Sequence, residues 1–343
     1  MRMHVTQKDI ADALGISRVT VTKALKDHPD IAEGTIKRVK DMAKELGYYP
    51  NFIASSLSSK RSNLIGAIFP KINHSFFSNA IESVYKAATE RGFEILPMIS
   101  FEDASREIRM VATLLSMRVA GIIAAISQGT KSNEIYKNAK KLGVPVVFLD
   151  RTLKDESFSS VTINDYKAAY DVIAYAISIG YKKIAHLAGY SHINIGIDRC
   201  NGFKAALEGN GISINPAWII EGGFTPEFGY EGLKKLSNAS EMPELIFAVN
   251  DSVAHGIYKA ADELSIKIPD DLGVIGCGDI EHSQLLSPPL TSVHMPIESM
   301  ACKAVEVLID EINNPGVSEC QHLVNETEIR IRESILPEKR SVT

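Results

Sequence analysis

Residues 17–25 carry side chains from which a DNA-reading surface could be built. The run combines basic Arg18 and Lys23 with hydroxyl groups, and it places apolar Val21 and Ala24 one helical turn apart. Basic and hydroxyl side chains donate hydrogen bonds to phosphates and to base edges in the major groove. We therefore interpret this run as a recognition helix whose apolar side docks on a small core, although a solvated surface helix would show a similar pattern.

Two other motifs have the chemistry to hold a small molecule. Arg199 opens the motif Arg-Cys-Asn-Gly-Phe, and its planar fork of donors suits a carboxylate or the hydroxyls of a sugar. Asn250 follows an apolar run at 245–249, and open α/β sheets bind ligands beyond the carboxyl ends of their strands. A surface ion pair is the alternative for Arg199, and Asp251 is interpreted as a helix cap.

Short neighbouring helices must hold the DNA-reading run. Thr6, with Asp9 three residues later, predicts a capped first helix that ends at Gly15, and Ser17 predicts the cap of the second helix. A third amphipathic helix is expected at 36–46. Three short helices around one small core are typical of a helix-turn-helix domain.

From residue 64 onward, short apolar strands alternate with helices, a pattern that predicts doubly wound parallel sheets. The number of strands predicts two sheets and therefore two lobes. The expected strands are 64–69, 93–99, 121–125, 144–149, 183–187, 245–249 and 273–277, and the expected helices include 77–91, 106–117, 166–179 and 252–264.

The predicted domain divisions follow from this change of pattern. The headpiece covers 1–50, and the serine-rich segment 51–63 is a linker or a marginal hinge helix. The core covers 64–340, with an N-lobe at about 64–163 and 294–325 and a C-lobe at about 164–293 and 326–340.

Charge is distributed unevenly along the chain. The formal net charge of the 343 residues is -5, but residues 1–62 hold 11 Lys and Arg against 7 Asp and Glu, which leaves -9 for the remainder. A small basic end on an acidic body concentrates the attraction for anions at that end.

Composition places the chain among globular proteins, with 45% hydrophobic and 23% charged residues. The sequence begins without an apolar signal segment and has no stretch of about 20 apolar residues, so we expect a cytoplasmic protein that does not bind membranes. The four cysteines lie far apart, so we expect buried thiols, no metal site and no cofactor; they are Cys200, Cys277, Cys302 and Cys320.

Together these motifs resemble the lactose-repressor (LacI/GalR) family. The similar segments are 5–14, 17–25, 45–51, 54–57, 64–66 and 199–203, and the likeness continues along nearly the whole chain. The resemblance implies an all-α helix-turn-helix headpiece and an α/β two-lobed core like the class I periplasmic binding proteins. It also implies a homodimeric transcription regulator that binds double-stranded operator DNA. A small-molecule effector between the lobes, such as a sugar or sugar derivative, would control that binding.

The functional positions of the family can be matched to this sequence. Arg18 and Val19 resemble the base-reading pair, and Leu57 resembles the hinge leucine that enters the minor groove. The other expected DNA contacts are Thr6, Ser17, Thr20, Thr22, Lys23, Tyr49, Asn51 and Ala54. The expected effector contacts are Phe76, Phe77, Asp150, Arg199, Phe224, Asn250 and Asp279. Asp150 and Arg151 together resemble a cleft-lining pair of the family. His192 and Asn194 lie in the loop before Arg199, from which they could reach the site, although exposed polar loop residues usually have no such role.

Two positions depart from the family pattern. Ser55 stands where the hinge usually has an arginine, and Gly278 stands where many relatives have an aspartate that binds effector hydroxyls. Asp279 lies one residue later, and the sequence leaves open whether it substitutes. The nature of the effector is open for the same reason.

Three other interpretations compete with this one. An enzyme has little support, because the sequence lacks a dinucleotide glycine motif, a phosphate loop, His-Glu-x-x-His and Gly-x-Ser-x-Gly. A free-standing sugar-binding protein would have a signal segment and no headpiece. A DNA-binding regulator controlled by a partner protein of the phosphocarrier type stays open because of Gly278. The short tail after Ile335 has no heptads, so we expect a dimer and not a tetramer.

Overall fold

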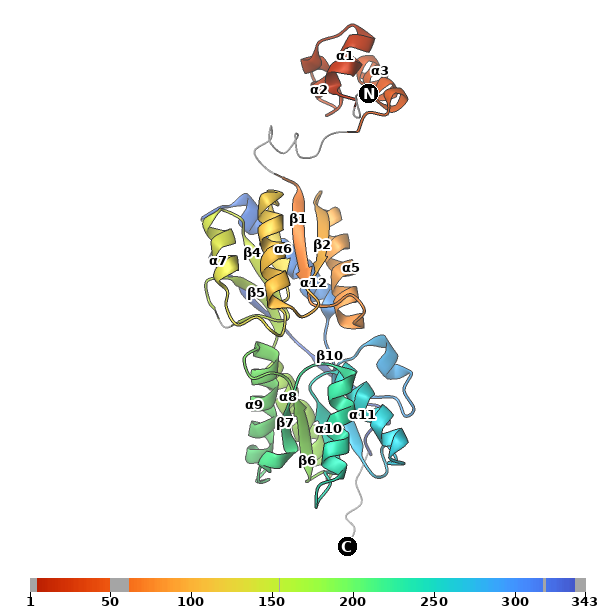
Figure 1. The fold of residues 1–343 in the computed structure, drawn as a ribbon, viewed down its shortest axis with the longest axis vertical. Coiled ribbons are helices and arrows are strands. Elements are labelled where there is room, and N and C mark those ends of the chain that lie inside the picture. The colour runs from red at the N-terminus through yellow and green to blue at the C-terminus, as the bar shows by residue number, and fades with distance from the viewer. Residues whose placement is uncertain (1–4, 50–61, 154, 317–318, 337–343) are drawn as a thin grey trace. The chain divides into compact units, whose positions relative to one another are not determined.

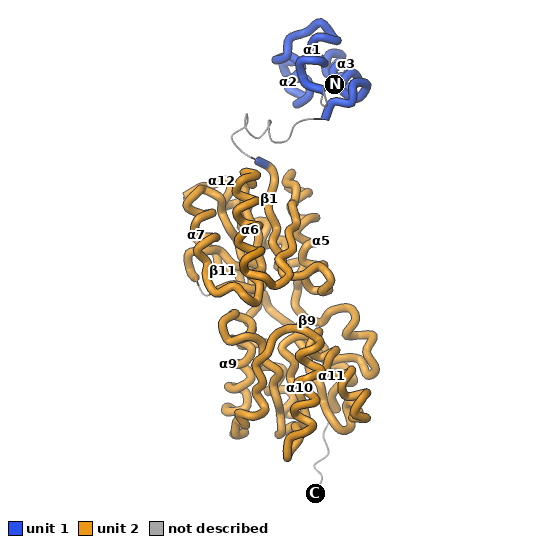
Figure 2. The backbone as a smooth tube through the Cα atoms, in the orientation of Figure 1, with its two compact units in different colours: residues 1–62 blue, residues 63–343 orange. Residues whose placement is uncertain are grey.

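The computed structural model describes residues 5–49, 62–153, 155–316 and 319–336. The chain divides into two compact units, Met1–Ser62 and Asn63–Thr343 (Figure 2). None of the helices in these described ranges is long and apolar enough to cross a membrane.

The first unit holds three helices, α1 (Gln7–Leu14), α2 (Arg18–Ala24) and α3 (Glu33–Leu46). Thr6 and Asp9 form the expected capping box of α1, and Gly15 ends this helix in a left-handed conformation with φ of 63°. Ser17 caps α2 as expected. The helices share one core, made of Ile10, Ala11, Val21, Ala24, Val39 and Ala43. The predicted helix-turn-helix is confirmed.

The second unit contains two six-stranded sheets (Figure 1). The first sheet is parallel throughout and has the order β11 (His322–Asn325), β5 (Ser159–Ile163), β4 (Val146–Leu149), β3 (Gly121–Ala124), β1 (Leu64–Phe69), β2 (Glu94–Ile99). The second has the order β12 (Glu328–Arg330), β10 (Thr291–His294), β9 (Gly273–Gly278), β8 (Leu245–Ala248), β6 (Ile184–Ala188), β7 (Ile219–Glu221). In the second sheet β12 runs antiparallel to β10, and the other neighbours are parallel.

Helices cover both faces of each sheet. On the first sheet, α5 (Ser75–Thr89) and α12 (Ile297–Asn313) share one face, and α6 (Ala104–Ser116) and α7 (Glu134–Lys141) share the other. On the second sheet, α8 (Asp165–Ser178) packs with α9 (Asn194–Gly209), and α10 (Pro226–Ser237) packs with α11 (Asp251–Glu263). Two 3₁₀ turns, η1 (Pro216–Trp218) and η2 (Glu281–Gln284), complete the C-lobe. The predicted two-lobed, doubly wound fold is confirmed.

The chain passes between the sheets after β5, after β10 and after β11. We call the part around the first sheet the N-lobe and the part around the second sheet the C-lobe. Loops that follow strands of one lobe contact loops that follow strands of the other: His192, after β6, bonds to Gln128, after β3, at 2.6 Å. The carboxyl ends of both sets of strands therefore meet between the lobes, where a doubly wound sheet binds ligands.

Candidate functional site

The start of α2 presents Arg18 and Val19 on the outside of the headpiece. Val19 is 66% exposed although it is apolar, and Arg18 is exposed beside it. The Thr20 N–H donates to Ser17 Oγ at 3.0 Å, which fixes this first turn. A guanidinium fork reads guanine, and an apolar side chain contacts the thymine methyl, so this capped turn has the chemistry of base recognition.

Thr22 is half-buried, so it faces outward less fully than the sequence pattern indicated. Its hydroxyl lies 2.7 Å from Gln7 Oε1, which joins α2 to α1. Thr22 therefore holds the recognition helix in place. Two further hydroxyls of the expected surface are engaged within the headpiece, Thr6 with Asp9 and Thr20 with Ser17.

Lys23 and Tyr49 are the remaining expected contacts that the structure describes. Lys23 Nζ pairs with Asp30 at 2.8 Å, but both side chains are well exposed, so a phosphate can compete for the lysine at small cost. Tyr49 is 86% exposed. The predictions for the hinge segment, Asn51, Ala54 and Leu57, lie outside the described residues.

Between the lobes, the guanidinium of Arg151 lies over two aromatic rings, one from each lobe. Its Cζ is 5.1 Å from the ring centroid of Phe77 in the N-lobe and 4.5 Å from that of Phe224 in the C-lobe. Its Nη1 donates to both carboxylate oxygens of Glu102, at 3.0 and 3.1 Å. Arg151 is only 4% exposed. Phe76 packs edge-on against Phe77, so it supports the position of that ring.

A tight turn aims Asp150 and Arg151 away from the end of β4. The Arg151 N–H donates to Leu149 O at 2.8 Å, and Asp150 has φ of 67°, which together make a γ-turn with a non-glycine residue in the left-handed region. Asn194 of the C-lobe holds this turn from both sides: its Nδ2 donates to Asp150 O, and its Oδ1 accepts from the Thr152 N–H, each at 2.9 Å.

Asp150 is buried, and burial together with the charge of Asp165 raises the pKa of its carboxyl to about 6, against the opposing effect of Arg199 and Arg151. A carboxyl group in this state changes its charge close to physiological pH.

Arg199 sits inside the C-lobe and is almost fully buried. Its Nε donates to Asp165 at 2.7 Å, and its Nη1 donates to Val249 O, so it ties α9 to α8 and to the end of β8. A Cβ at Gly202 would lie 2.1 Å from Tyr166 O, which confirms that this glycine allows α9 to pack closely on α8. The structure thus gives the arginine of this motif a structural role in addition to the predicted ligand contact.

Asn250 is the N-cap of α11, because its side chain accepts from the Val253 N–H at 2.9 Å. The interpretation of Asp251 as the cap is therefore wrong. Asp251 instead accepts from the Ile280 N–H and from two serine hydroxyls, Ser283 and Ser292, all within 3.0 Å. Burial raises the pKa of Asp251, and these hydrogen bonds oppose that effect. Through these hydrogen bonds Asp251 joins three segments of the C-lobe. The local sequence does not predict this role.

Asp279 is held within the C-lobe. Arg332 Nη2 lies 2.6 Å from one of its carboxylate oxygens, and His294 Nδ1 lies 3.0 Å from the other. Gly278 has φ of 132°, so the chain turns there in a conformation that favours glycine. Both oxygens of Asp279 are thus engaged, and a role as an effector contact would require one of them to be released.

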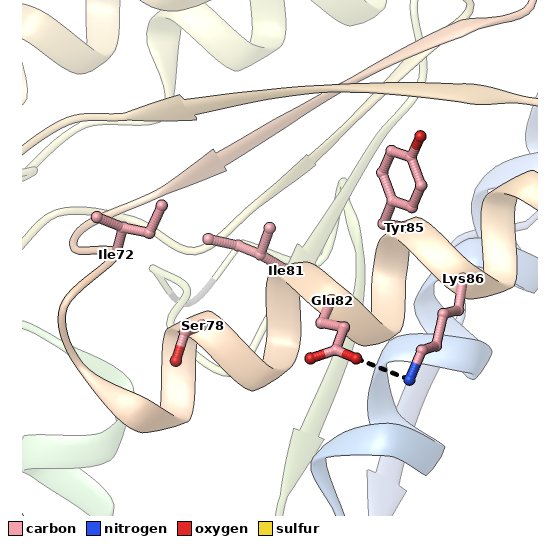
Figure 3. A pocket seen from close by; sticks show the side chains of 6 residues that line it. All are labelled: Ile72, Ser78, Ile81, Glu82, Tyr85 and Lys86. Atoms are coloured by element: carbon pink, nitrogen blue, oxygen red, sulfur yellow. Dashed lines mark ion pairs between the residues drawn. The ribbon is translucent and has the colours of Figure 1, made fainter.

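The part of the chain that the structure describes contains no group of three or more His, Cys, Asp or Glu side chains able to hold a metal ion. A hollow of about 460 Å³ does occur on the exposed side of α5 (Figure 3). It is lined by Ile72, Ser78, Ile81, Glu82, Tyr85 and Lys86. Its mainly apolar lining fits a protein surface better than a polar small molecule.

Comparison with known proteins places this architecture in a family. Residues 6–51 match the family model described as bacterial regulatory proteins, lacI family, and residues 173–335 match the model of a periplasmic binding protein-like domain. The chain is 30% identical to catabolite control protein A of Priestia megaterium over 92% of this chain and 95% of that protein. The chain belongs to the LacI family.

Two solved structures of transcription regulators share this fold. The lac repressor dimer bound to operator and an anti-inducer is similar with a TM-score of 0.85 and 23% identity over 97% of this chain and 99% of that one. The regulator CelR in complex with cellobiose is similar with a TM-score of 0.73 and 25% identity over 96% of this chain and 100% of that one. As a LacI-family regulator, the chain has a DNA-binding headpiece and an effector-binding core.

Replacement of Asp150 by Asn should change how stability depends on pH. In the folded protein the pKa of Asp150 is about 6, which lies above the usual value of 3.8. The contribution of protonated Asp150 to the free energy of unfolding is therefore complete below about pH 4 and is lost as the pH rises through 6. Asparagine tolerates the left-handed turn and cannot ionise. The free energy of unfolding of Asp150→Asn, relative to wild type, should therefore improve by about 2 kcal/mol between pH 4.5 and pH 7.5. Denaturation followed by the fluorescence of Trp218, the single tryptophan, measures this. An equal difference at both pH values would contradict the assignment.

Replacement of Arg199 by Ala should destabilise the core by about 3–5 kcal/mol, because it leaves the carboxylate of Asp165 buried and unpaired. The double variant Arg199→Ala, Asp165→Asn should recover part of that loss, whereas Arg91→Ala, which breaks the exposed pair with Glu306, should cost less than about 1 kcal/mol. Urea denaturation gives all three values. Strict additivity of the Arg199 and Asp165 effects would show that the two side chains are not coupled.

Proposed function

We propose that this protein is a homodimeric, sequence-specific transcription regulator that reads a pseudo-palindromic operator through α2. The observation that carries the proposal is the exposed pair Arg18 and Val19 on the capped first turn of a helix-turn-helix. The proposal keeps the division into a headpiece, a hinge at 51–63 and a core, and it assigns no catalytic role to any residue.

We propose further that a polar small molecule bound between the lobes controls DNA binding. The site is formed by Phe77 and Phe224 with Asp150 and Asn250 around them, while Phe76, Arg199 and Asp279 act mainly as supports. Hydrogen bonds cross between the lobes through polar side chains, so a ligand there changes the balance between closed and open arrangements. The CelR structure with cellobiose supports a sugar-like ligand.

A regulator controlled by a partner protein is the second candidate. Gly278 favours it, because the position that offers a carboxylate to effector hydroxyls in many relatives offers no side chain here. A small molecule that alters operator binding in the purified protein would exclude this candidate.

The hollow on α5 is the face through which we propose that two copies pair. Ile72 is 58% exposed and Tyr85 is 47% exposed at this face, beside β2 at the edge of its sheet. Exposed apolar surface of this kind is typical of interfaces between subunits. In the sequence the N-lobe follows the proposed hinge at 51–63, so pairing of N-lobes would link two headpieces within one dimer.

Selection of binding sites from random DNA should return a two-fold symmetric sequence, because a symmetric dimer presents two equivalent recognition helices. Arg18→Ala should change the preferred base at one position of each half-site and lower affinity there by about 1–3 kcal/mol. Lys37→Ala, an exposed position on α3, should at most weaken binding uniformly. An asymmetric enriched site, or an unchanged base preference in Arg18→Ala, would contradict the proposal.

Tyr85→Asp should weaken dimerisation at least tenfold, because it would place a carboxylate in an apolar contact. Leu142→Asp, at a residue 71% exposed at the end of α7 in the same lobe, is the matched control and should leave dimerisation unchanged. Sedimentation velocity across a dilution series measures both. A wild-type dissociation constant for Tyr85→Asp would place the dimer contact on another face.

A further inference from the structure

Two buried polar atoms without a hydrogen-bond partner lie at the interlobe site. Across the described residues, such atoms are Arg151 Nε, His74 Nδ1, Asn133 Oδ1 and His186 Nε2. Arg151 and His74 both lie against the ring of Phe77, at 5.1 and 5.5 Å from its centroid. An unpaired buried polar atom costs about 1–3 kcal/mol, so a pair of them around one ring indicates a place where a ligand supplies the missing bonds.

The other two unpaired atoms do not belong to this place. His186 is stacked between Phe203 and Phe247 inside the C-lobe, and burial lowers its pKa to about 4. Asn133 precedes α7 in the N-lobe. The pair at Phe77 is therefore the one that lies where the two lobes meet.

The orientation of Arg151 defines what it can bind. Both carboxylate oxygens of Glu102 accept hydrogen bonds from Arg151 Nη1. The Nε–H and the adjacent Nη2 form a second edge of the guanidinium, which faces away from Glu102. Two parallel N–H groups at such an edge match the two oxygens of a carboxylate. The guanidinium lies over the rings of Phe77 and Phe224, at 5.1 and 4.5 Å from their centroids, and these rings restrict its motion and strengthen a charge-assisted hydrogen bond by excluding water.

The surrounding charges limit the negative charge that a ligand can carry. Arg151 is balanced by Glu102, and Arg199 is balanced by Asp165, while Lys71 lies near enough to His74 to affect it electrostatically. Asp150 lies next to Arg151 and adds negative charge once it ionises. A carboxylate carries one charge into this environment, whereas a phosphate monoester carries nearly two and would meet more repulsion from Glu102 and Asp150.

His74 supplies a hydrogen-bonding group for a ligand hydroxyl. Burial and the nearby charge of Arg151 lower the pKa of His74 to about 4, so the ring is neutral at pH 7. Its Nε2 is bonded to Ser252 Oγ at 2.8 Å, which leaves Nδ1 to exchange one hydrogen bond with a hydroxyl group.

We propose that the effector of this protein is a sugar acid whose carboxylate binds the Nε and Nη2 edge of Arg151 and whose hydroxyl group bonds to His74 Nδ1. This inference rests on the proposed effector site and specifies its ligand class. It assigns to Arg151 the discrimination between an acidic sugar and its neutral counterpart.

Isothermal titration of the full-length protein tests the proposal with matched ligands. D-galacturonate and D-glucuronate should be compared with D-galactose and D-glucose, which differ only by a hydroxymethyl in place of the carboxylate, and with the two hexose 6-phosphates. At least one uronate should bind about 10–100-fold more tightly than its neutral counterpart, because a charge-assisted pair of bonds is lost in the neutral sugar. Both the neutral sugars and the phosphates should bind more weakly than that uronate.

Three variants make the test specific. Arg151→Lys keeps the charge but loses the fork, so uronate affinity should fall about tenfold or more while neutral sugars are unaffected. Glu102→Gln removes the competing carboxylate and should raise uronate affinity. Arg106→Lys is the matched control, because Arg106 also lies over a phenyl ring, that of Phe101 at 5.0 Å, but on the exposed surface, and it should change nothing. Thermal unfolding of each variant checks that it is folded.

Each contrary outcome is distinguishable from failure of the proposed function. Equal binding of neutral sugars and uronates, unaffected by Arg151→Lys, would overturn the sugar-acid assignment and leave a small-molecule effector in place. Tighter binding of the hexose 6-phosphates than of the uronates would show that the site prefers a phosphate to a carboxylate, and it would overturn the proposal. No binding of any probe, in protein that still binds its selected operator, would also overturn it and would favour control by a partner protein.

Discussion

Parallel strands bring their carboxyl ends to one edge of a sheet, and the interlobe site depends on this constraint. Glu102 follows β2, Arg151 follows β4, Phe224 follows β7 and Asn250 follows β8. The two sheets meet at these edges, so residues far apart in the sequence come within hydrogen-bonding distance without any dedicated ligand-binding domain. The chain passes between the lobes three times, and these connections keep the two edges facing each other.

The two buried arginines in this region are each paired with a carboxylate. Arg199 is paired with Asp165, and Arg151 is paired with Glu102. Asp251 accepts hydrogen bonds from two serine hydroxyls and a main-chain N–H, and within the described ranges it forms no ion pair. Because an unpaired buried charge costs several kcal/mol, these arrangements resist rearrangement and hold the side chains around the site in fixed positions. The region is therefore a rigid polar framework, and the adjustable part is the contact between the lobes.

The sequence predicted the fold better than the details of the site. Apolar runs such as 64–69 and 273–277 are predicted as strands because their composition alone indicates buried strands. Strands β5 and β12 are not predicted. The sequence of β5 is Ser-Ser-Val-Thr-Ile and β12 has only three residues, so neither strand has a clear hydrophobic pattern. Capping residues of the headpiece were recognised because their interactions are local.

Arg199 and Asp251 show what local patterns cannot convey. The sequence indicates a fork of donors at Arg199, but its burial against Asp165 depends on the packing of α8 on α9. The bonds of Asp251 likewise join α11 to segments around residues 280–292. Arg151 is expected from the family resemblance to line the cleft together with Asp150. Its position beside two aromatic rings cannot be predicted from the local sequence, because one ring comes from each lobe.

The γ-turn at Asp150 bears on how such regulators diversify. Its shape is held by main-chain atoms of Leu149, Arg151 and Thr152 and by the side chain of Asn194, none of which depends on the identity of the side chain at position 151. A substitution there exchanges the chemical group offered to a ligand while the backbone that aims it is retained. After gene duplication, a copy of this protein could therefore acquire a different effector through very few mutations, and the scaffold would not have to be rebuilt.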